Sequence, residues 1–375
     1  MKRTVLFLGI MGVVFGIGVS AAALSICSYV STAERAKKSV TDLESLGLSM
    51  SYRYFDDWAT PGVETSGGRV GLDYNRLFDS PSFGYTLIGD VKLLLADFFP
   101  TSGLVDAAGT TRYYLAEEEP TFVFGSMEGS ITTGQPQPAI HIGAGLGYGR
   151  FSDVTPLAKA FKIETELLKV DAISQPLGDS VLMGIAEVIG SKEYISVDDQ
   201  VADVVNQIQT VSRMTLSPRQ VLKVEDMILA TGGARRCGWA VQAGVGYQLV
   251  DPYNQPKGFL VTASADAAFV PSPDGQLLFH ADLSGPINIV NQHTLSVRSS
   301  YKYVLSDTST LQSSYTLLRV QPLGQPASVS QAGAVVLGFV VGRTGVGLQA
   351  SLLKPASASA WSLDLSISAA ISFGL

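Results

Sequence analysis

Residues 361–375 read WSLDLSISAAISFGL, and almost every second residue of this stretch is apolar. Successive side chains of a β-strand point to opposite faces, so a period of two predicts a strand with one apolar face and one polar or small face. The apolar set continues to the last residue: Trp361, Leu363, Leu365, Ile367, Ala369, Ile371, Phe373 and Leu375.

The same alternation recurs along most of the chain, in residues 46–54, 70–74, 83–87, 140–148, 239–249, 293–303 and 346–352. Alternating segments of about ten residues, divided by turn residues, are typical of transmembrane β-barrels. A soluble β-sandwich alternates in the same way and is the alternative. The expected strands are roughly 10 to 15 residues long, whereas globular strands average about 5 to 6, which favours the barrel. Residues 234–375 contain no Glu and few other charged residues, which also favours the barrel.

The composition excludes several classes of protein. Charged residues make up 16% of the 375 residues, whereas a soluble domain has about 25%. Two cysteines, 9% aromatic residues and the lack of a three-residue glycine period exclude disulfide scaffolds, disordered chains and collagen. The net charge of -7 lacks the basic surface that nucleic-acid binding requires, so no nucleic-acid partner is expected.

The N-terminus has the features of a secretory signal peptide, which we assign to residues 1–23. Lys2 and Arg3 precede an uncharged, apolar run that ends in Ala21-x-Ala23, a small-residue cleavage pattern. An uncleaved membrane anchor is the alternative, because about 20 apolar residues can span a bilayer. Cys27 and the distant Cys237 are able to pair in an oxidising periplasm, but the sequence leaves that pairing open.

Between Arg150 and Arg236 the period of two gives way to helical patterns. Four helices are expected to begin at Thr155-Pro156, at Asp179 or Ser180, at Ser196 and at Ser217-Pro218, because these residue types favour helix N-termini. Their apolar stripes predict the core of a small bundle. A groove for a periplasmic protein partner is the alternative use of residues 152–233.

The predicted organisation therefore has five parts. A signal peptide (1–23) and an N-terminal periplasmic segment (24–44) precede the first part of a barrel (45–151). The helical insert (152–233) follows, and the second part of the barrel completes the chain (234–375). We expect six strands before the insert and eight after it, an antiparallel all-β barrel of about 14 strands, with 12 possible. After six strands the chain returns to the periplasm, which is where the insert is expected.

The mature chain resembles bacterial outer-membrane β-barrel proteins of the porin-like superfamily. The closing strand is similar to the assembly signal of that superfamily, with Phe373 close to the end, although Leu375 stands where Phe or Trp is usual. The resemblance implies a location in the outer membrane of the Gram-negative envelope, contact with its lipid, and recognition of the C-terminal strand by the barrel assembly machinery. It implies no particular solute. The fatty-acid transporter family also has 14 strands, but its N-terminal plug motif is missing.

No catalytic, cofactor or metal site is expected, and the protein is not expected to be an enzyme. His141, His280 and His293 lack a nucleophile motif and are interpreted as polar lumen residues. Asp198-Asp199 fits the first turn of a helix better than a metal site. Residues 143–149 have glycine at every second position, which does not match the G-x-G-x-x-G phosphate-binding pattern.

The leading functional hypothesis is a porin-like channel or transporter for small solutes, and the alternative is a structural anchor that presents the helical insert to a partner. The candidate lumen-lining residues are Asp73, Asp90, Lys92, Arg298, Lys302 and Arg319. The glycines expected to point inward are Gly143, Gly145, Gly147, Gly149, Gly238, Gly244 and Gly246. The candidates for a periplasmic aromatic girdle are Tyr148, Trp239 and Phe373.

Two similar phrases flank the insert, AGLGY at 144–148 and AGVGY at 243–247. We predict that their strands are neighbours and that part of the insert, or residues 28–45, occupies the lumen beside their glycines, since glycine in a strand often marks close approach by another group. The alternative is that these glycines only allow the barrel wall to curve.

Overall fold

The computed structural model describes residues 26–29, 41–55, 65–117, 119–191, 196–230, 234–253, 258–306, 308–341, 344–356, 358 and 360–371. The chain divides into two compact units. We call residues 35–151, 239–267 and 278–375 the sheet unit, and residues 1–34, 152–238 and 268–277 the helical unit.

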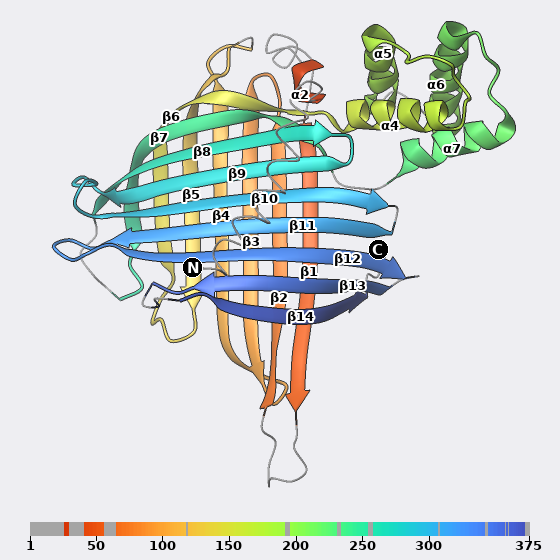
Figure 1. Cartoon of the computed structure of the whole chain (residues 1–375). Helices are drawn as coiled ribbons and strands as arrows, with labels where there is room; N and C mark the ends of the chain where they lie inside the picture. The colour runs from red at the N-terminus through yellow and green to blue at the C-terminus, as the bar shows by residue number, and fades with distance from the viewer. Residues whose placement is uncertain are drawn as a thin grey trace. The chain divides into compact units, whose positions relative to one another are not determined.

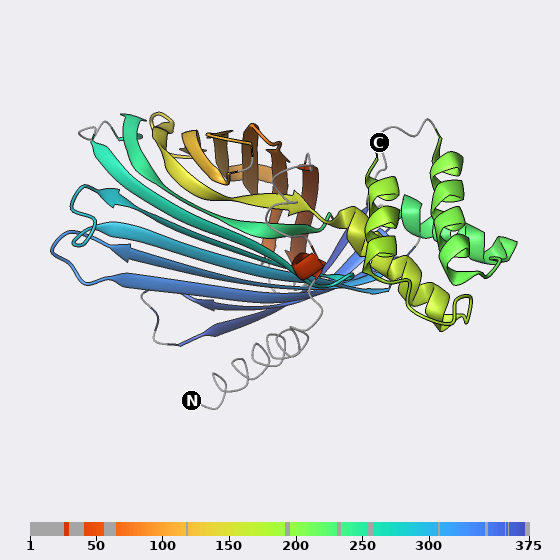
Figure 2. The same cartoon turned by 90° about the horizontal axis from the view of Figure 1, so that it is seen from above.

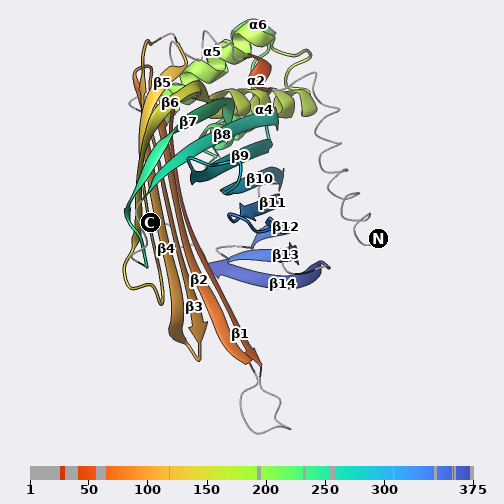
Figure 3. The ribbon, with the colours of Figure 1, turned by 90° about the vertical axis from the view of Figure 1, so that its left-hand side faces the viewer.

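Fourteen strands form one sheet in which each strand lies beside the next strand of the sequence (Figures 1 and 3). The first six are β1 (Thr41–Phe55), β2 (Thr65–Asp79), β3 (Phe83–Ala96), β4 (Phe99–Tyr114), β5 (Thr121–Thr132) and β6 (Ala139–Asp153). The other eight are β7 (Arg236–Val250), β8 (Phe259–Ser272), β9 (Gly275–Pro286), β10 (His293–Ser306), β11 (Ser309–Gln321), β12 (Ser328–Val341), β13 (Thr344–Lys354) and β14 (Ser362–Ile371).

The registers from β1 to β6 and from β10 to β14 are antiparallel. The predicted antiparallel all-β sheet, with six strands before the helices and eight after them, is confirmed. One boundary differs from the expectation. β1 begins at Thr41, which pairs with Asp79, so the last four residues of the expected segment 24–44 belong to the strand.

The register shows why these sequences form a two-faced sheet. In β1 and β2, Leu46 lies opposite Tyr74 and Leu48 opposite Leu72, whereas Gly47 between them lies opposite Asp73. Directly opposite residues project from the same face, so apolar and polar pairs alternate across the ladder. We call the side that carries Asp73 the polar face and the side that carries Leu48 the apolar face.

The helical unit contains α4 (Thr155–Lys169), α5 (Asp179–Gly190), α6 (Val197–Ser212) and α7 (Pro218–Leu229), drawn in yellow-green to green in Figure 2. The helix starts match the sequence signals. The Ser196 hydroxyl accepts from the amide of Asp199 at 3.1 Å, and Ser217 forms a capping box with Gln220. Among the described residues, no helix combines the length and the apolar character needed to span a bilayer.

The helical unit has a hydrophobic core of its own. Its fully buried side chains include Ile163 of α4, Ile185 of α5, and Val204 and Ile208 of α6. The buried residues of α4 and α6 recur every three or four positions, so each of these helices has one apolar face in the core. The predicted bundle core is therefore present in the structure.

The two cysteines form a disulfide within the helical unit. Cys27 lies in the short helix α2 (Ile26–Tyr29) and Cys237 at the start of β7, with their Cα atoms 5.5 Å apart. Cys237 and the neighbouring Ile26 and Val270 are buried in the core of this unit. The structure thus answers the pairing question that the sequence left open.

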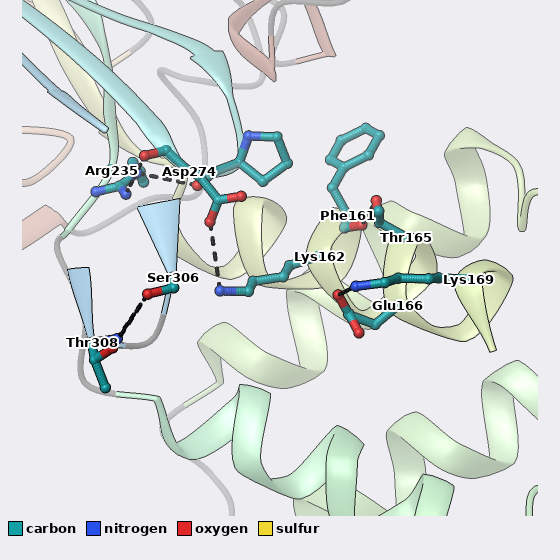
Figure 4. A network of polar contacts seen from close by, with 10 residues as sticks. Phe161, Lys162, Thr165, Glu166, Lys169, Arg235, Asp274, Ser306 and Thr308 are labelled. Carbon is teal, nitrogen blue, oxygen red and sulfur yellow. Dashed lines mark hydrogen bonds and ion pairs between the residues drawn. The ribbon is translucent and has the colours of Figure 1, made fainter. Parts of the chain in front are cut away.

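A polar network holds the two ends of the helical segment together. The amide of Val154 donates to the carbonyl oxygen of Arg235 at 2.8 Å, and the amide of Arg235 donates to Thr155 Oγ1 at 2.8 Å. The Arg235 guanidinium donates to the carbonyl oxygen of Asp274 at 3.1 Å, and Lys162 forms an ion pair of 3.5 Å with the Asp274 carboxylate (Figure 4). The first and last residues of the helical segment therefore lie side by side, and Arg235 also contacts the turn between β8 and β9.

Candidate functional site: the polar face of the sheet

The middle of the polar face carries a row of carboxylates. Asp73 of β2 lies opposite Asp90 of β3, which in turn lies opposite Asp106 of β4. Like charges directly opposite one another destabilise a sheet. Lys92 partly offsets this cost, because its Nζ lies 2.6 Å from Asp90 Oδ1. A side-chain hydrogen bond between Asp73 and Asp90 further reduces the repulsion.

Further ionisable side chains lie on the same face. Glu128 of β5 is directly opposite His141 of β6. His280 Nδ1 of β9 lies 2.7 Å from Asp266 Oδ1 of β8, and Asp282 is two residues farther along the same strand. Glu128 and Asp282 interact electrostatically although their strands are not neighbours. The polar face is therefore curved, so that charged groups of distant strands approach one another.

Arg298 of β10 extends this arrangement. It interacts electrostatically with Asp90 and Asp106, on β3 and β4, and with Asp282 on β9. Lys302 lies on the same face as Arg298, because the two residues are separated by an even number of positions on β10. Of the candidate lumen-lining residues, the structure brings Asp73, Asp90, Lys92 and Arg298 together around one charged surface, with Lys302 on the same face.

Arg319 departs from the expected set. It lies opposite Leu295 of β10 and Val329 of β12, which belong to the apolar face. The reason is parity: the position of β11 that faces Arg298 is Thr316, and Arg319 is an odd number of residues away from it. Arg319 is exposed near the end of β11, where a long basic side chain on an apolar face can reach water.

Toward one end of β2, β4 and β5 the polar face changes from exposed to buried. In β2, Asp73 is exposed but Asp79 is only 1% exposed. In β5, Glu128 is exposed but Phe122 is fully buried. In β4, Asp106 is half-buried but Arg112 is only 6% exposed. The buried residues form what we call the arginine–aromatic cluster, which consists of Asp79, Arg112, Tyr114, Phe122, Phe124 and Arg150.

Ring contacts and a hydrogen bond join the members of this cluster. The Tyr114 hydroxyl donates to Asp79 Oδ2 at 3.0 Å. The rings of Tyr114 and Phe122 meet edge to face with their centroids 5.6 Å apart. The guanidinium of Arg150 lies 3.8 Å from the Tyr114 ring centroid, and that of Arg112 lies 5.8 Å from the Phe122 ring centroid. Such cation–π contacts are favourable when they are shielded from water.

The backbone conformation of Gly149 turns the Arg150 side chain toward the polar face. Its φ of +121° lies in the left-handed range that glycine tolerates and other residues do not. The strict alternation of β6 would place Arg150 on the side of Tyr148, yet the Arg150 side chain stacks on Tyr114 of the polar face. Arg150 also donates to the carbonyl oxygens of Pro81 at 2.8 Å and of Glu117 at 3.2 Å. It thereby links the β2–β3 and β4–β5 turns.

The strands that flank the helices, β6 and β7, are neighbours, as their similar phrases predicted. A Cβ added to Gly145 would lie 2.6 Å from the Cα of Gly244 and 2.7 Å from Phe124 Cε1, and one added to Gly244 would lie 2.9 Å from Phe124 Cζ. The ring of Phe122 is similarly close to Gly147. In the part of the chain that the structure describes, the space beside these glycines therefore contains rings of β5, and not the insert or residues 28–45 as predicted.

The other glycines have different surroundings. A Cβ on Gly143 would lie 2.6 Å from Ser126 Oγ, and one on Gly246 would lie 3.2 Å from the carbonyl oxygen of Ile142. Gly238 belongs to the helical unit and has a φ of +136°. Backbone proximity at Gly246 and a glycine-specific φ at Gly238 explain these positions without an occupant in the lumen.

The aromatic pair expected at the membrane interface is formed on the apolar face. The rings of Tyr148 and Trp239 have centroids 5.6 Å apart, and their side chains are 46% and 49% exposed. Exposed aromatic side chains at strand ends are characteristic of the interfacial belt of membrane barrels. Phe373, the third expected member, lies outside the described residues.

In the part of the chain that the structure describes, no group of three or more His, Cys, Asp or Glu side chains is arranged to hold a metal ion. No protein-family model matches the chain, and no curated protein matches its sequence. The chain is similar to a solved structure described as "CymD monoaromatic hydrocarbon channel", with 11% identity over 92% of this chain and 91% of that chain and a TM-score of 0.28. A likeness at this TM-score carries no weight in the function proposed for the chain.

Proposed function

We propose that the chain closes into an outer-membrane β-barrel and acts as a porin-like channel or transporter for small solutes. The observation that carries this proposal is the distribution of side chains on the sheet. Large apolar residues such as Leu48, Leu146 and Leu365 are 69%, 63% and 73% exposed on one face. The other face carries the exposed charges of Asp73 and Arg298. This arrangement fits lipid outside and water inside.

The approach of the two edge strands and the energetics of a bilayer both support closure. Some Cα atoms of β1 lie within 8 Å of β14, so the two edge strands approach each other. In a bilayer, an unpaired strand edge leaves N–H and C=O groups without partners at a cost of several kcal/mol each, and only closure removes that cost. The C-terminal strand is then the part of the barrel that the assembly machinery would recognise.

The disulfide supports a periplasmic location for the helical unit. Cys27 follows the expected cleavage site at Ala23 by four residues and is bonded to Cys237. The mature N-terminus and the helical unit therefore belong on one side of the membrane, and a disulfide persists in the oxidising periplasm. A protease site placed between α6 and α7 should be protected in intact cells and cut after the outer membrane is permeabilised. Cleavage in intact cells would place the helices outside.

The proposed channel is tested by planar-bilayer conductance of the purified, folded protein. Folding is verified first by different gel migration of unboiled and boiled samples, and boiled protein is the control for detergent artefacts. We expect discrete conductance steps, because a barrel of about 14 strands encloses a polar lumen. A folded barrel that passes no ions would contradict the channel.

A structural anchor is the second candidate, because the helical unit has its own core and exposes apolar side chains on α7. Leu222 and Leu229, seven residues apart, lie on one side of that helix and are 60% and 48% exposed. Deletion of residues 156–233 separates the two functions. A channel should still conduct after the deletion, whereas an anchor should fold and lose its cellular role.

A further inference from the structure

We propose that the arginine–aromatic cluster is the constriction that limits which solutes move along the polar face. This inference rests on the proposed channel function. Toward the same end of the sheet, the polar sides of β2 and β5 change from exposed to buried and that of β4 changes from half-buried to buried. Three strands showing the same gradient indicate a local filling of the space on that side, and they point to the narrowest part of the solute path.

The rings that fill this space come from the sheet itself. Phe122 and Phe124 project from β5 toward Gly147, Gly145 and Gly244 of β6 and β7. Since any side chain at those glycines would collide with a ring or with neighbouring backbone, the glycines make room for the two rings. Removing both rings therefore leaves an opening bordered by the glycine backbone of β6 and β7 on one side and by Tyr114 and Arg112 on the other.

A purely structural core would be expected to be apolar, but this cluster contains buried charges. Arg112 is 94% buried, and of its guanidinium nitrogens only Nη2 has a hydrogen-bond partner, Thr86 Oγ1 at 2.9 Å. Its Nε and Nη1 are buried without a hydrogen-bond partner. Buried donors that lack protein partners destabilise a fold unless a water molecule or an ion satisfies them.

Asp79 shows the same feature as Arg112. Both residues lie opposite Gly84 of β3, one from each side, and Asp79 Oδ1 is also buried without a hydrogen-bond partner. In the described chain, no ion pair within 4.0 Å joins the two side chains. The two side chains interact electrostatically without forming a direct ion pair. On this proposal, the charge of Arg112 also acts on ions that pass through the constriction.

The first test compares the double variant Phe122→Ala/Phe124→Ala with the wild type in planar bilayers. Val123→Ala is the matched control, because Val123 lies between the two rings on the same strand but faces the apolar side and is 38% exposed. Gel migration of unboiled and boiled protein verifies folding of all three proteins. We expect a severalfold increase in single-channel conductance for the double variant, with passage of larger sugars in liposome swelling, and no change for the control.

The outcomes separate this inference from the channel proposal. Equal conductance and equal sugar cut-off in all three folded proteins would overturn the constriction and leave the channel in place. Absence of conductance in all three would overturn the channel, and the constriction with it. If the double variant does not fold, the single variant Phe124→Ala replaces it, with the same expected direction.

A second measurement addresses Arg112 through ion selectivity, which a merely structural residue would not change. In a salt gradient, Arg112→Met should shift the reversal potential toward cation permeation, because a positive charge at a constriction repels cations. Arg112→Lys keeps the charge and should retain the wild-type potential. Equal potentials for folded Arg112→Met and the wild type would overturn the role of Arg112.

Discussion

The helical unit and the sheet unit place the same types of side chain in opposite environments. In the helical unit, Ile163 and Ile208 are fully buried. In the sheet unit, Leu48, Leu146 and Leu365 are among the most exposed side chains. The hydrophobic effect acts on both units, so the exposed apolar face of the sheet unit is expected to have an apolar partner, which we propose is lipid.

The largest expected effect concerns the core of the helical unit. Ile163→Ala should destabilise this unit by about 2 to 5 kcal/mol, because it leaves a cavity among fully buried side chains. Hydrogen exchange of the α4 amides in the full-length protein measures the effect. Leu222→Ala is the control and should change stability by less than about 0.5 kcal/mol, since Leu222 is 60% exposed. Equal effects of the two variants would contradict the assigned core.

The second prediction tests the two faces of the sheet with neighbouring residues of β10. Val297→Arg places a charge on the apolar face and should cost about 2 to 4 kcal/mol near the middle of a bilayer. Ser296→Arg places the same charge on the polar face, where it should be tolerated. The fraction of heat-modifiable protein recovered in membranes distinguishes them. Equal recovery of the two variants would contradict the assignment of an apolar and a polar face to the sheet unit.

The third prediction concerns the buried end of the polar face, the part of the sheet that most resembles a protein core. Tyr114→Phe removes the hydrogen bond to Asp79 and leaves a buried carboxylate oxygen without it, so a loss of about 1 to 3 kcal/mol is expected. The temperature at which gel migration changes reports this loss. Tyr113→Phe is the control, because the neighbouring Tyr113 is 60% exposed. A lower transition temperature for Tyr113→Phe alone would contradict the assignment of Tyr114 as buried and Tyr113 as exposed.

The smallest expected effect is a pH dependence of the helical unit. Lys223 lies 2.8 Å from Glu166 and, with a smaller contribution from Lys169, holds the pKa of the Glu166 carboxyl below its usual range. Because the pKa is lower in the folded state, the stabilisation is complete above the ordinary glutamate pKa of about 4.3 and is lost as the pH falls through the folded value. Thermal unfolding followed by helical circular dichroism should show this loss in the wild type.

Glu166→Gln is the variant that isolates this effect, since it removes the titrating group and keeps the shape of the side chain. The difference in unfolding temperature between wild type and variant should be present at neutral pH and should disappear in acid. A difference that is the same at both pH values would exclude the ion pair as its source.

Local patterns were sufficient to predict most elements. Period-two alternation predicted the strands, and the residues Thr155-Pro156, Ser196 and Ser217 predicted helix starts that the structure contains. These signals act through the backbone geometry of a few neighbouring residues, so one sequence carries them completely. The similar phrases around Gly145 and Gly244 also predicted correctly that β6 and β7 are neighbours.

Features that depend on register were not predictable in the same way. Arg319 was expected to line the lumen like Arg298, but the face of a residue depends on how β10 and β11 are aligned. The arginine–aromatic cluster was missed because it needs the registers of β2, β3, β4 and β5 together. Arg150 also needs the left-handed φ of Gly149, which alternation alone does not indicate. The row of Asp73, Asp90 and Asp106 was detectable only once these alignments were known.

The separation of the two cysteines has a consequence for the order of biogenesis. On the proposed export route the N-terminus enters the periplasm first, and Cys237 follows Cys27 by 210 residues. The first six strands and all four helices of the insert emerge between them. Oxidation of this pair is therefore a late event, and a chain arrested in secretion before Cys237 emerges should still react with a thiol reagent at Cys27. The redox state of Cys27 would then report how far an individual chain has been delivered.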